Sequence, residues 1–569
     1  MPTHEPLTIV IVGGVAAGAS AAARARRCHE QARIILLEKD AYVSFANCGL
    51  PYYLGGEIAD RSKLLVATPA FLARRFKIEV RTHTEVTAID RTRRVLTVLD
   101  RPSGQTAPLV YDRLILTPGA TPLVPPIPGV DAANVFTLRK LEDADRLHAF
   151  LAAQHPARAV VVGAGFIGLE MVEQLRWLGL HVALVELLDQ VLPPLDPEMA
   201  HLVQEELTRQ GVELHLGDGI KSLRREGPKA DAVELNSGAV LPADLVVLGI
   251  GVRPNTALAK AAGLELGPSG GIKVNEHLQT SDPLIYAAGD AAETVHGVTG
   301  LPGRVPLAGP ANRAGRLAGE HAATGHAPPM GPVLGTAIVR VFQVTAGMTG
   351  LSAKAAAKAA IPFRSVLIEA RDHAGYFPGA RPMILKLLYN PQDGRVLGAQ
   401  AVGAAGIDKR IDVIATALQL RGTVQDLSNL DLAYAPPFGS AKDPVHMAAF
   451  AALNQMADLT DTLAPDADLA GLQVLDVRTN EEYATGHEPD TRHIPLDDLR
   501  DRLGELDAAR PTVVMYHSGL RAHVAVRILR QHGFAAVRNL TGGYLMRRHA
   551  RPAGISETSS LKTTKGIAP

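Results

Sequence analysis

The sequence predicts an α/β fold that contains two similar units of strand, glycine-rich turn, helix and strand. In the first unit, an apolar run at 7–12 precedes the glycine-rich stretch 13–18, an alanine-rich helix and a second strand at 33–38. The second unit occupies 159–186 and has its glycine-rich turn at 163–168. This order is typical of Rossmann-like domains, in which a dinucleotide binds over the turn. Two such units therefore predict two dinucleotide-binding domains.

Length and composition limit the possible classes of protein. The 569 residues suffice for about four domains of ordinary size. Hydrophobic residues make up 47% and charged residues 20%, as in soluble globular proteins. Lys plus Arg and Asp plus Glu both number 58, so the zero net charge argues against binding to nucleic acid through bulk charge. The two cysteines exclude a disulfide scaffold and a thiolate zinc finger, and we expect no bound metal.

The sequence gives no indication of a membrane-spanning or targeting segment. No uncharged apolar run reaches the roughly 18 residues of a membrane span. Segment 7–23 is apolar, but 1–6 contains no Lys or Arg and glycines interrupt the run, which argues against a signal peptide. We therefore expect a cytoplasmic protein without a membrane span.

The second glycine turn fits the pattern G-x-G-x-x-G through Gly163, Gly165 and Gly168. The first glycine forms the turn, the second lets a pyrophosphate approach the backbone, and the third packs the helix on the strand. Glu186 ends the next strand, where a carboxylate binds both ribose hydroxyls and repels a 2′-phosphate. The pattern predicts a site for NADH in preference to NADPH, with NADPH still possible.

The first glycine turn is less regular. Gly13, Gly14 and Gly18 are present, but Val15 occupies the place of the middle glycine. Glu38 ends the next strand, 20 residues after Gly18, and is again expected at a ribose. This turn alone is a moderate indication of a second dinucleotide.

Two later segments favour FAD as that second dinucleotide. The segment 280–290, TSDPLIYAAGD, resembles the second FAD signature of two-dinucleotide flavoproteins, in which the aspartate contacts the ribitol. The segment 117–120, TPGA, resembles the motif where the chain crosses between FAD and NAD domains. The expected cofactor-binding residues are Gly13, Gly14, Gly18, Glu38, Lys39, Thr117, Gly119, Gly163, Gly165, Gly168, Glu186, Gly289 and Asp290.

Cys48 is the candidate reactive thiol. It lies in SFANCGLPYY at 44–53, where dithiol flavoprotein reductases carry a C-x4-C pair. Val43 and Tyr53 occupy the positions of a second cysteine, so Cys48 is expected to work alone. A single thiol cycles through a mixed disulfide or persulfide, or through sulfenic acid, and both routes remain open. Cys28, late in the first helix, is expected to be inert.

Residues 1–450 resemble the coenzyme A–disulfide reductases, a group of single-cysteine pyridine-nucleotide disulfide oxidoreductases that includes NADH-dependent persulfide and polysulfide reductases. The supporting motifs are SFANCGLPYY, HAGYFPGA at 373–380 and AYAPPFGSAKDP at 433–444. The resemblance implies FAD, NADH and coenzyme A (CoA) as substrate or bound ligand. It also implies a homodimer that reduces CoA disulfide, CoA persulfide or polysulfide, with a sulfur-donor protein as a further possible partner.

The resemblance also implies a CoA pocket beside Cys48. Its positions fall on Ser20, Arg24, Arg27, Ser44, Asn47, Asn312 and Lys442. One lysine of the family is replaced by Phe76, although Arg75 and Lys77 flank it. Two catalytic tyrosines of the other subunit correspond to Tyr376 and Tyr434.

The C-terminal region contains VLDVR at 474–478, HIPL at 493–496 and LTGGY at 540–544. On these segments, residues 467–552 resemble a rhodanese domain, whose active loop reads C-x-x-G-x-R. Here the loop reads YHSGLR at 516–521, so Tyr516 occupies the cysteine position or the loop is one residue shorter. No cysteine follows Cys48 anywhere in the chain. We therefore predict no sulfurtransferase activity and a docking or regulatory role, with anion binding through Arg521 still possible.

These patterns together predict two Rossmann-like domains for FAD and NAD, an α+β dimerisation domain and a small α/β rhodanese-like domain. Within the dimerisation domain we expect strands at 336–344, 363–369 and 383–389 and a helix at 407–421. The expected boundaries are 1–122 with 251–330 (FAD), 123–250 (NAD(P)H), 331–455 (dimerisation), 456–466 (linker), 467–555 (rhodanese-like) and 556–569 (disordered tail).

Two other functions remain open from the sequence. An NADH oxidase or peroxidase would cycle Cys48 through sulfenic acid. A redox-responsive binding protein would use the C-terminal unit to recruit a partner. The CoA-pocket residues and the rhodanese-like unit favour sulfur chemistry over both.

Overall fold

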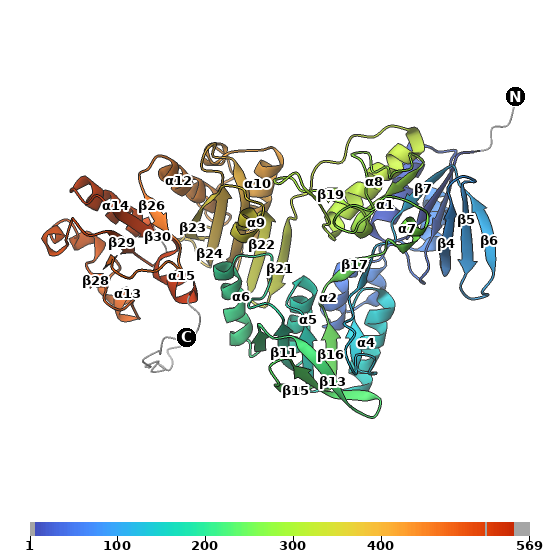
Figure 1. Cartoon of the computed structure of the whole chain (residues 1–569), viewed down its shortest axis with the longest axis horizontal. Helices are drawn as coiled ribbons and strands as arrows, with labels where there is room; N and C mark the ends of the chain where they lie inside the picture. Colours follow the sequence, from blue (N-terminus) through green and yellow to red (C-terminus); the bar gives the residue numbers. More distant parts are fainter. Residues whose placement is uncertain (1–5, 518–519, 551–569) are drawn as a thin grey trace.

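The computed structural model describes residues 6–517 and 520–550. Figure 1 shows four lobes: a blue and lime lobe with the N-terminal unit, a green lobe below it, a yellow-brown central lobe and an orange-red C-terminal lobe. Both glycine-rich units form parallel sheets, as the predicted α/β fold class requires. The tail expected to be disordered at 556–569 lies outside the described residues, as do Ser518 and Gly519 of the C-terminal loop.

The first glycine-rich unit forms a parallel sheet in the order β18-β7-β1-β2-β3. The glycine turn follows the central strand, so it lies at the carboxyl edge of the sheet, where ligands bind in such folds. The strands are β1 (Thr8–Val12), β2 (Arg33–Leu37), β3 (Glu79–Arg81), β7 (Arg113–Leu116) and β18 (Ile285–Ala287). A separate antiparallel sheet contains β4 (Thr84–Asp90), β5 (Val95–Asp100) and β6 (Thr106–Val110).

Two helices of this lobe, α1 (Ala16–Cys28) and α8 (Ala308–Thr324), pack unusually close together. A Cβ added at Gly315 would lie 2.1 Å from the carbonyl oxygen of Ala17, and one at Gly319 would lie 2.2 Å from that of Ala21. Because these glycines carry no side chain, the two backbones can meet. The contact brings the polar residues of both helices to one edge of the lobe.

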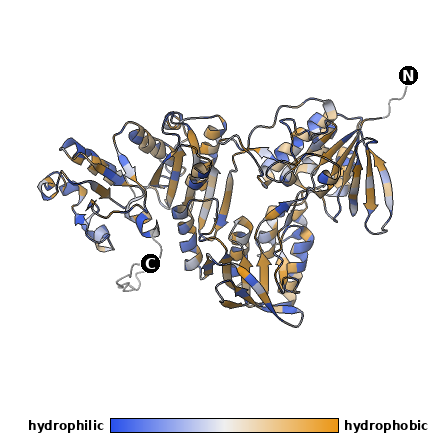
Figure 2. Ribbon diagram, in the orientation of Figure 1, coloured by the Kyte–Doolittle hydropathy of each residue, from blue (hydrophilic) through white to orange (hydrophobic). Residues whose placement is uncertain are grey.

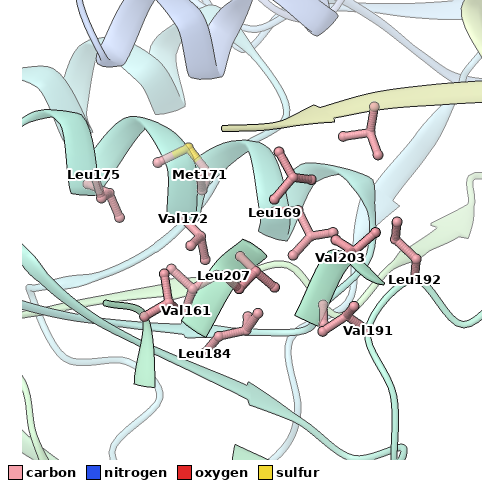
Figure 3. Packing of buried hydrophobic residues seen from close by; sticks show 14 of the residues in the cluster. Val161, Leu169, Met171, Val172, Leu175, Leu184, Val191, Leu192, Val203 and Leu207 are labelled. Atoms are coloured by element: carbon pink, nitrogen blue, oxygen red, sulfur yellow. The ribbon is translucent and has the colours of Figure 1, made fainter. Parts of the chain in front are cut away.

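The second glycine-rich unit forms a parallel sheet in the order β12-β11-β10-β16-β9. Its strands are β9 (Val135–Thr137), β10 (Arg158–Val162), β11 (His181–Glu186), β12 (Glu213–Leu216) and β16 (Leu245–Leu248). Figure 3 shows Leu169 and Val172 of α5 (Phe166–Trp177) among apolar side chains of the sheet and of α6 (Pro197–Arg209). Burial of each such side chain stabilises the fold by about 1.5–3 kcal/mol. This packing fixes the start of α5, and with it the glycine turn, against the sheet.

Further helices and strands belong to these two lobes. The helices are α2 (Leu50–Leu54), α3 (Pro69–Phe76), α4 (Leu141–Gln154) and α7 (Ala257–Ala261). The strands β8 (Ala120–Pro122) and β17 (Val252–Pro254) pair where the chain passes between the two lobes, and β13 (Ile220–Glu226), β14 (Lys229–Leu235) and β15 (Val240–Pro242) form an antiparallel sheet.

The third lobe is an antiparallel sheet in the order β21-β22-β25-β24-β23, packed against α10 (Ile407–Gln419) and α12 (Pro444–Met456). Its strands are β21 (Ala337–Val341), β22 (Val344–Gly350), β23 (Arg364–Arg371), β24 (Pro382–Tyr389) and β25 (Val396–Gly403). We expected one strand at 336–344, but the chain reverses at Phe342, which has φ +53°, and forms a hairpin. The sequence analysis missed β22 and β25 because glycines interrupt their apolar patterns.

The C-terminal lobe is a parallel sheet in the order β26-β30-β29-β27-β28. Its strands are β26 (Asp461–Leu463), β27 (Gln473–Asp476), β28 (Arg492–His493), β29 (Thr512–Met515) and β30 (Val537–Leu540), and its helices are α13 (Asn480–Ala484), α14 (Leu520–Gln531) and α15 (Gly543–Ala550). The expected linker at 456–466 therefore needs correction, because part of it forms β26 and pairs with β30. An edge strand needs only one partner strand, so a short extended segment can join the sheet without an apolar pattern of its own.

The C-terminal lobe packs on the third lobe and on α6. Met546 of α15 is fully buried and shares an apolar cluster with Leu367 of β23 and Ile384 of β24. Figure 2 shows the apolar strands inside each lobe and hydrophilic residues on the outer helices. Within 6–517 and 520–550, no helix combines the length and the apolar character needed to cross a membrane.

Candidate functional site

A single cavity of about 3230 Å³ connects the two glycine turns with Cys48. Gly13 of the first turn, Gly163 of the second turn and Cys48 all line it. The structure thus brings both expected dinucleotide sites and the expected thiol into one space.

Each glycine turn requires glycine at its first position. Gly13 and Gly163 have φ angles of +99° and +102°, a region in which other residues are strained. A Cβ added at Gly13 would lie 2.1 Å from the carbonyl oxygen of Thr117. By contrast, a Cβ added at Gly165 meets no atom within 4 Å, which leaves open space before the N-terminus of α5. That space fits the approach of a pyrophosphate.

An acidic residue holds each turn from the next strand. Glu38 accepts a hydrogen bond from the Gly14 amide at 2.8 Å, and Glu186 accepts one from the Ala164 amide at 2.7 Å. Burial raises the pKa of Glu38, while the Gly14 amide opposes the rise. The sequence analysis assigned these carboxylates to ribose hydroxyls, and the structure adds a contact that shapes the turn.

Most residues expected at the dinucleotides line the cavity: Gly13, Glu38, Lys39, Thr117, Gly119, Gly163, Gly165, Glu186, Gly289 and Asp290. The other three lie behind the wall. A Cβ at Gly18 would lie 1.8 Å from the carbonyl oxygen of Gly13, and one at Gly168 would lie 1.9 Å from that of Gly163. Gly14 packs on Val43. The ten lining residues fit contact with two bound dinucleotides. Gly14, Gly18 and Gly168 instead allow neighbouring protein segments to pack closely behind the turns.

Cys48 lies in the 3-10 turn η1 (Asn47–Gly49), directly before α2, and is accessible from the cavity. Asn47 Nδ2 donates to the carbonyl oxygen of Arg139 at 3.1 Å, and the Arg139 guanidinium pairs with Asp290. Burial and then the charge of Glu170 raise the pKa of the Cys48 thiol, while Arg139 opposes them. The sequence analysis missed Arg139, since no motif marks it.

The carboxyl group of Glu170 lines the cavity together with Cys48, and the phenol of Tyr52 contacts it from outside the lining. Tyr52, four residues after Cys48, donates to Glu170 Oε1 at 3.2 Å. Burial raises the pKa of Glu170 to about 7, and the Tyr52 hydrogen bond limits the rise. The sequence analysis missed both residues, although Tyr52 is part of SFANCGLPYY and Glu170 closely follows Gly168.

Five of the residues expected at CoA line the cavity: Ser20, Arg27, Ser44, Asn47 and Asn312. Ser20 Oγ donates to Asn312 Oδ1 at 2.6 Å across α1 and α8. Arg24, one turn further along α1, does not line the cavity, and Glu320 of α8 holds its guanidinium at 2.7 Å. This ion pair compensates the charge of Arg24, which weakens its expected role at a phosphate.

Phe76, which occupies the position of the expected lysine, is part of a cation–aromatic stack. The Arg27 guanidinium lies 5.3 Å from the centre of the Phe76 ring, and Arg75 lies 4.5 Å from that of Phe71. The two rings are 6.1 Å apart, and all four residues line the cavity. Among the residues that the structure describes, no carboxylate lies within ion-pairing distance of Arg27 or Arg75. The stack therefore presents two uncompensated positive charges beside two aromatic rings.

The two expected tyrosines lie on the third lobe, where their hydroxyl oxygens are 2.9 Å apart. Tyr376 is 76% exposed and Tyr434 is 48% exposed. The hydrogen bond from Tyr434 raises the pKa of Tyr376. Neither tyrosine lines the cavity of the same chain, and the exposed Lys442 does not line it either.

In the C-terminal lobe, residues of the loop that departs from the rhodanese pattern contact other side chains and backbone groups of the same chain. Arg521 donates to both oxygens of Glu482 at 2.8 and 3.0 Å, and its guanidinium lies 3.8 Å from the centre of the Tyr516 ring. The carbonyl oxygens of Tyr516 and His517 accept amide hydrogen bonds from α15. His517 also lies 3.8 Å from Glu369 of β23. With its charge already compensated by Glu482, Arg521 is a poor candidate for binding an anion.

Three regions of the chain match known protein families. Residues 7–315 match the pyridine nucleotide-disulphide oxidoreductases, 336–444 match the dimerisation domain of the same proteins, and 458–545 match the rhodanese-like domain.

Individual relatives agree with these matches. The chain is 35% identical over 444 residues to a coenzyme A disulfide reductase of Staphylococcus aureus, covering 78% of this chain and 99% of the relative. The crystal structure of reduced Bacillus anthracis CoADR-RHD superposes with a TM-score of 0.92 at 44% identity, covering 96% of this chain and 98% of the other. A NAD-dependent persulfide reductase from A. fulgidus gives a TM-score of 0.90 at 38% identity, covering 95% and 100%.

Proposed function

The chain belongs to the pyridine nucleotide-disulphide oxidoreductases, and we propose that it uses NADH and FAD to reduce CoA disulfide, CoA persulfide or polysulfide through Cys48. The observation that carries this proposal is the placement of Cys48 in the cavity that joins both glycine turns. Cys28, the other cysteine, does not line this cavity and packs against an apolar cluster. Cys48 is thus the thiol available for the reaction.

The proposed chemistry is a thiol–disulfide exchange followed by reduction. The thiolate of Cys48 attacks one sulfur of CoA disulfide, the S–S bond breaks, and one CoA thiolate leaves as a mixed disulfide forms on Cys48. When bound, NADH and FAD supply the two electrons that cleave this mixed disulfide. The sum is CoA disulfide, NADH and a proton giving two CoA thiols and NAD⁺. With CoA persulfide, attack on the outer sulfur releases one CoA thiolate and leaves a persulfide on Cys48. Two electrons from NADH and FAD, when bound, would then release hydrogen sulfide and restore the Cys48 thiolate.

Recognition of CoA is assigned to α1, α3 and α8. The stack of Arg27, Phe76, Phe71 and Arg75 combines positive charge with aromatic faces, which suits the phosphates and the adenine of CoA. Arg75 thereby takes the place of the family lysine that Phe76 replaces. The Ser20–Asn312 pair joins an earlier part of α1 to α8.

Glu186 supports NADH as the reductant. Its carboxylate faces the cavity beside the second glycine turn and would repel a 2′-phosphate. The two residues that follow it, Leu187 and Leu188, carry no charge for such a phosphate.

The active site is proposed to be completed in a homodimer. Tyr376, Tyr434 and Lys442 lie on the domain that matches dimerisation domains, exposed and outside the cavity of their own chain. A second copy that presents this face to Cys48 would bring the phenols to the leaving thiolate, where they can hydrogen-bond or donate a proton.

The rhodanese-like domain is proposed to be inactive as a sulfurtransferase. None of the residues after Cys48 is a cysteine, and neither phenol nor imidazole forms a stable persulfide. Its packing on the third lobe through Met546 is consistent with a docking role, and a sulfur-donor protein remains a possible partner.

The decisive experiment is anaerobic oxidation of NADH by the FAD-loaded protein, with and without CoA disulfide. Rapid oxidation that requires the disulfide supports the proposal, and CoA persulfide and polysulfide are then ranked by kcat/KM. Cys48→Ser should abolish turnover while FAD stays bound, and Cys28→Ser is the matched control. Oxidation that requires air instead of disulfide would favour an NADH oxidase.

A further inference from the structure

One arginine of the third lobe reaches the segment that carries Cys48. Arg340 of β21 donates to Glu57, just after α2, at 3.1 Å. It also donates to Glu173 of α5 at 2.8 and 3.0 Å. The same guanidinium lies 5.4 Å from the centre of the Tyr52 ring and 4.8 Å from that of Trp177. A single side chain of β21 in the third lobe thus contacts α2, the segment that follows it, and α5 of the second lobe.

This contact joins partly exposed and buried groups: the side chains of Arg340 and Glu57 are 37% and 35% exposed, whereas Glu173 and Gln174 lie in the interior. Glu173 is fully buried and also accepts the Phe342 amide at 2.8 Å. Gln174, also fully buried, donates to Glu57 at 2.7 Å and to Glu173 at 3.1 Å. Breaking a buried pair by removing one partner is costly because the other charge stays buried. The arrangement therefore fixes α2 firmly against α5.

The catalytic scheme above does not use this cluster, yet the cluster lies directly behind Tyr52. We propose that Arg340 is a positioning residue for the reactive thiol: it clamps α2 from the third lobe and, through Tyr52, orients the Glu170 carboxyl that shares the cavity with Cys48. The inference rests on the proposed role of Cys48, and it adds Glu170 as a proton-holding group of the same site.

The charges around Glu170 fix the direction of the expected effects. Burial raises the pKa of Glu170 to about 7, the Tyr52 hydrogen bond lowers it, Glu173 raises it and Arg340 lowers it. Ionised Glu170 in turn raises the pKa of Cys48, whose other charged neighbours are Arg139 and Asp290. When Glu170 is ionised, the fraction of Cys48 present as thiolate at a given pH is therefore smaller than when Glu170 is neutral.

The test is the pH dependence of alkylation of Cys48 by iodoacetamide, measured on the FAD-loaded full chain in a Cys28→Ser background. Only the thiolate reacts, so the logarithm of the rate rises with pH below the thiol pKa. Ionisation of Glu170 should flatten this rise near pH 7, since it raises the thiol pKa. Glu170→Gln should remove the inflection.

Arg340→Gln should move the inflection to higher pH, because the cation that favours ionised Glu170 is gone. Arg158→Gln is the matched control: it breaks an ion pair with Asp244 in the second lobe and should leave the inflection in place. If Arg340→Gln fails to retain FAD, Tyr52→Phe decides the question, and its inflection should also move upward.

An unchanged inflection in Arg340→Gln or, where that variant does not fold, in Tyr52→Phe would overturn the inference. An inflection that survives Glu170→Gln would overturn it as well. Because alkylation needs no CoA substrate, these outcomes are separate from those of the NADH oxidation assay. A protein that turns over CoA disulfide normally but lacks the predicted shift would retain the proposed function and lose this inference.

Discussion

The carboxylate of Glu186 lies 2.7 Å from the amide nitrogen of Ala164, in the middle of the second glycine turn. Its other oxygen accepts the Leu188 amide at 3.0 Å. The acid expected to select the dinucleotide therefore also holds the loop over which we propose that the dinucleotide binds. Loss of its side chain should affect both the shape of the turn and the affinity for the nucleotide.

We expect Glu186→Ala to lower kcat/KM for NADH by about 10- to 100-fold, because hydrogen bonds to a charged group contribute about 1.5–3 kcal/mol. The preference for NADH over NADPH should narrow, since the charge that repels a 2′-phosphate is removed. Steady-state kinetics with both nucleotides measures this. Glu213→Ala, on the exposed start of β12, is the control and should change neither value. Unchanged NADH kinetics in Glu186→Ala would refute the assignment.

Arg27→Ala and Arg75→Ala should each raise KM for CoA disulfide by about tenfold, as expected for one charge-assisted contact to a phosphate. Polysulfide carries no CoA phosphates, so its turnover should change little. Arg74→Ala serves as the control. Arg74 is an exposed residue of α3, the helix that carries Arg75, and its side chain does not line the cavity. Equal losses with both substrates would show that the stack supports the fold and does not recognise CoA.

Asp196 links the second and third lobes in a buried cluster. Lys386 Nζ and Gln400 Nε2 both donate to its Oδ2 at 2.7 Å. Burial raises the pKa of Asp196, but the charge of Lys386 and the hydrogen bonds outweigh burial, so the pKa lies below its usual value. The carboxylate therefore stabilises the fold above the unfolded pKa and loses this contribution as the pH falls through the folded pKa.

Asp196→Asn should reduce the free energy of unfolding by about 3 kcal/mol at neutral pH, because it leaves Lys386 buried with less compensation. The difference from the parent protein should shrink as the pH falls below about 4. Urea unfolding at several pH values measures both. Asp131→Asn breaks an exposed pair with Arg225 and should cost less than about 1 kcal/mol. A pH-independent difference would contradict the role of the charge.

The full chain with Cys48→Ser should not transfer sulfur from thiosulfate to cyanide. Tyr516 cannot carry a persulfide, and Arg521 is held by Glu482. The variant also removes the thiol that lines the cavity. Formation of thiocyanate above the uncatalysed rate would show that the rhodanese-like domain has a catalytic group that the sequence does not reveal.

Local patterns account for the features that sequence analysis predicted correctly. The Rossmann-like units were recognisable because a strand, a turn at positive φ and a close helix contact each demand particular residues at fixed spacing. The family resemblance added the dimerisation and rhodanese-like domains. By contrast, the hairpin at Phe342 and the edge strand β26 were missed, since glycine-rich strands and short edge strands carry weak patterns.

The site shows the same division. The sequence by itself determined the glycine turns, their following acids and the identity of the single cavity thiol, because these depend on neighbouring residues. Three ion pairs depend on the tertiary structure alone. Arg24 pairs with Glu320, and Arg139 pairs with Asp290. Arg340 pairs with Glu57, from which it is separated by 283 positions in the sequence. Such contacts arise from the packing of separate lobes, where burial and charge compensation act between residues that no local spacing connects.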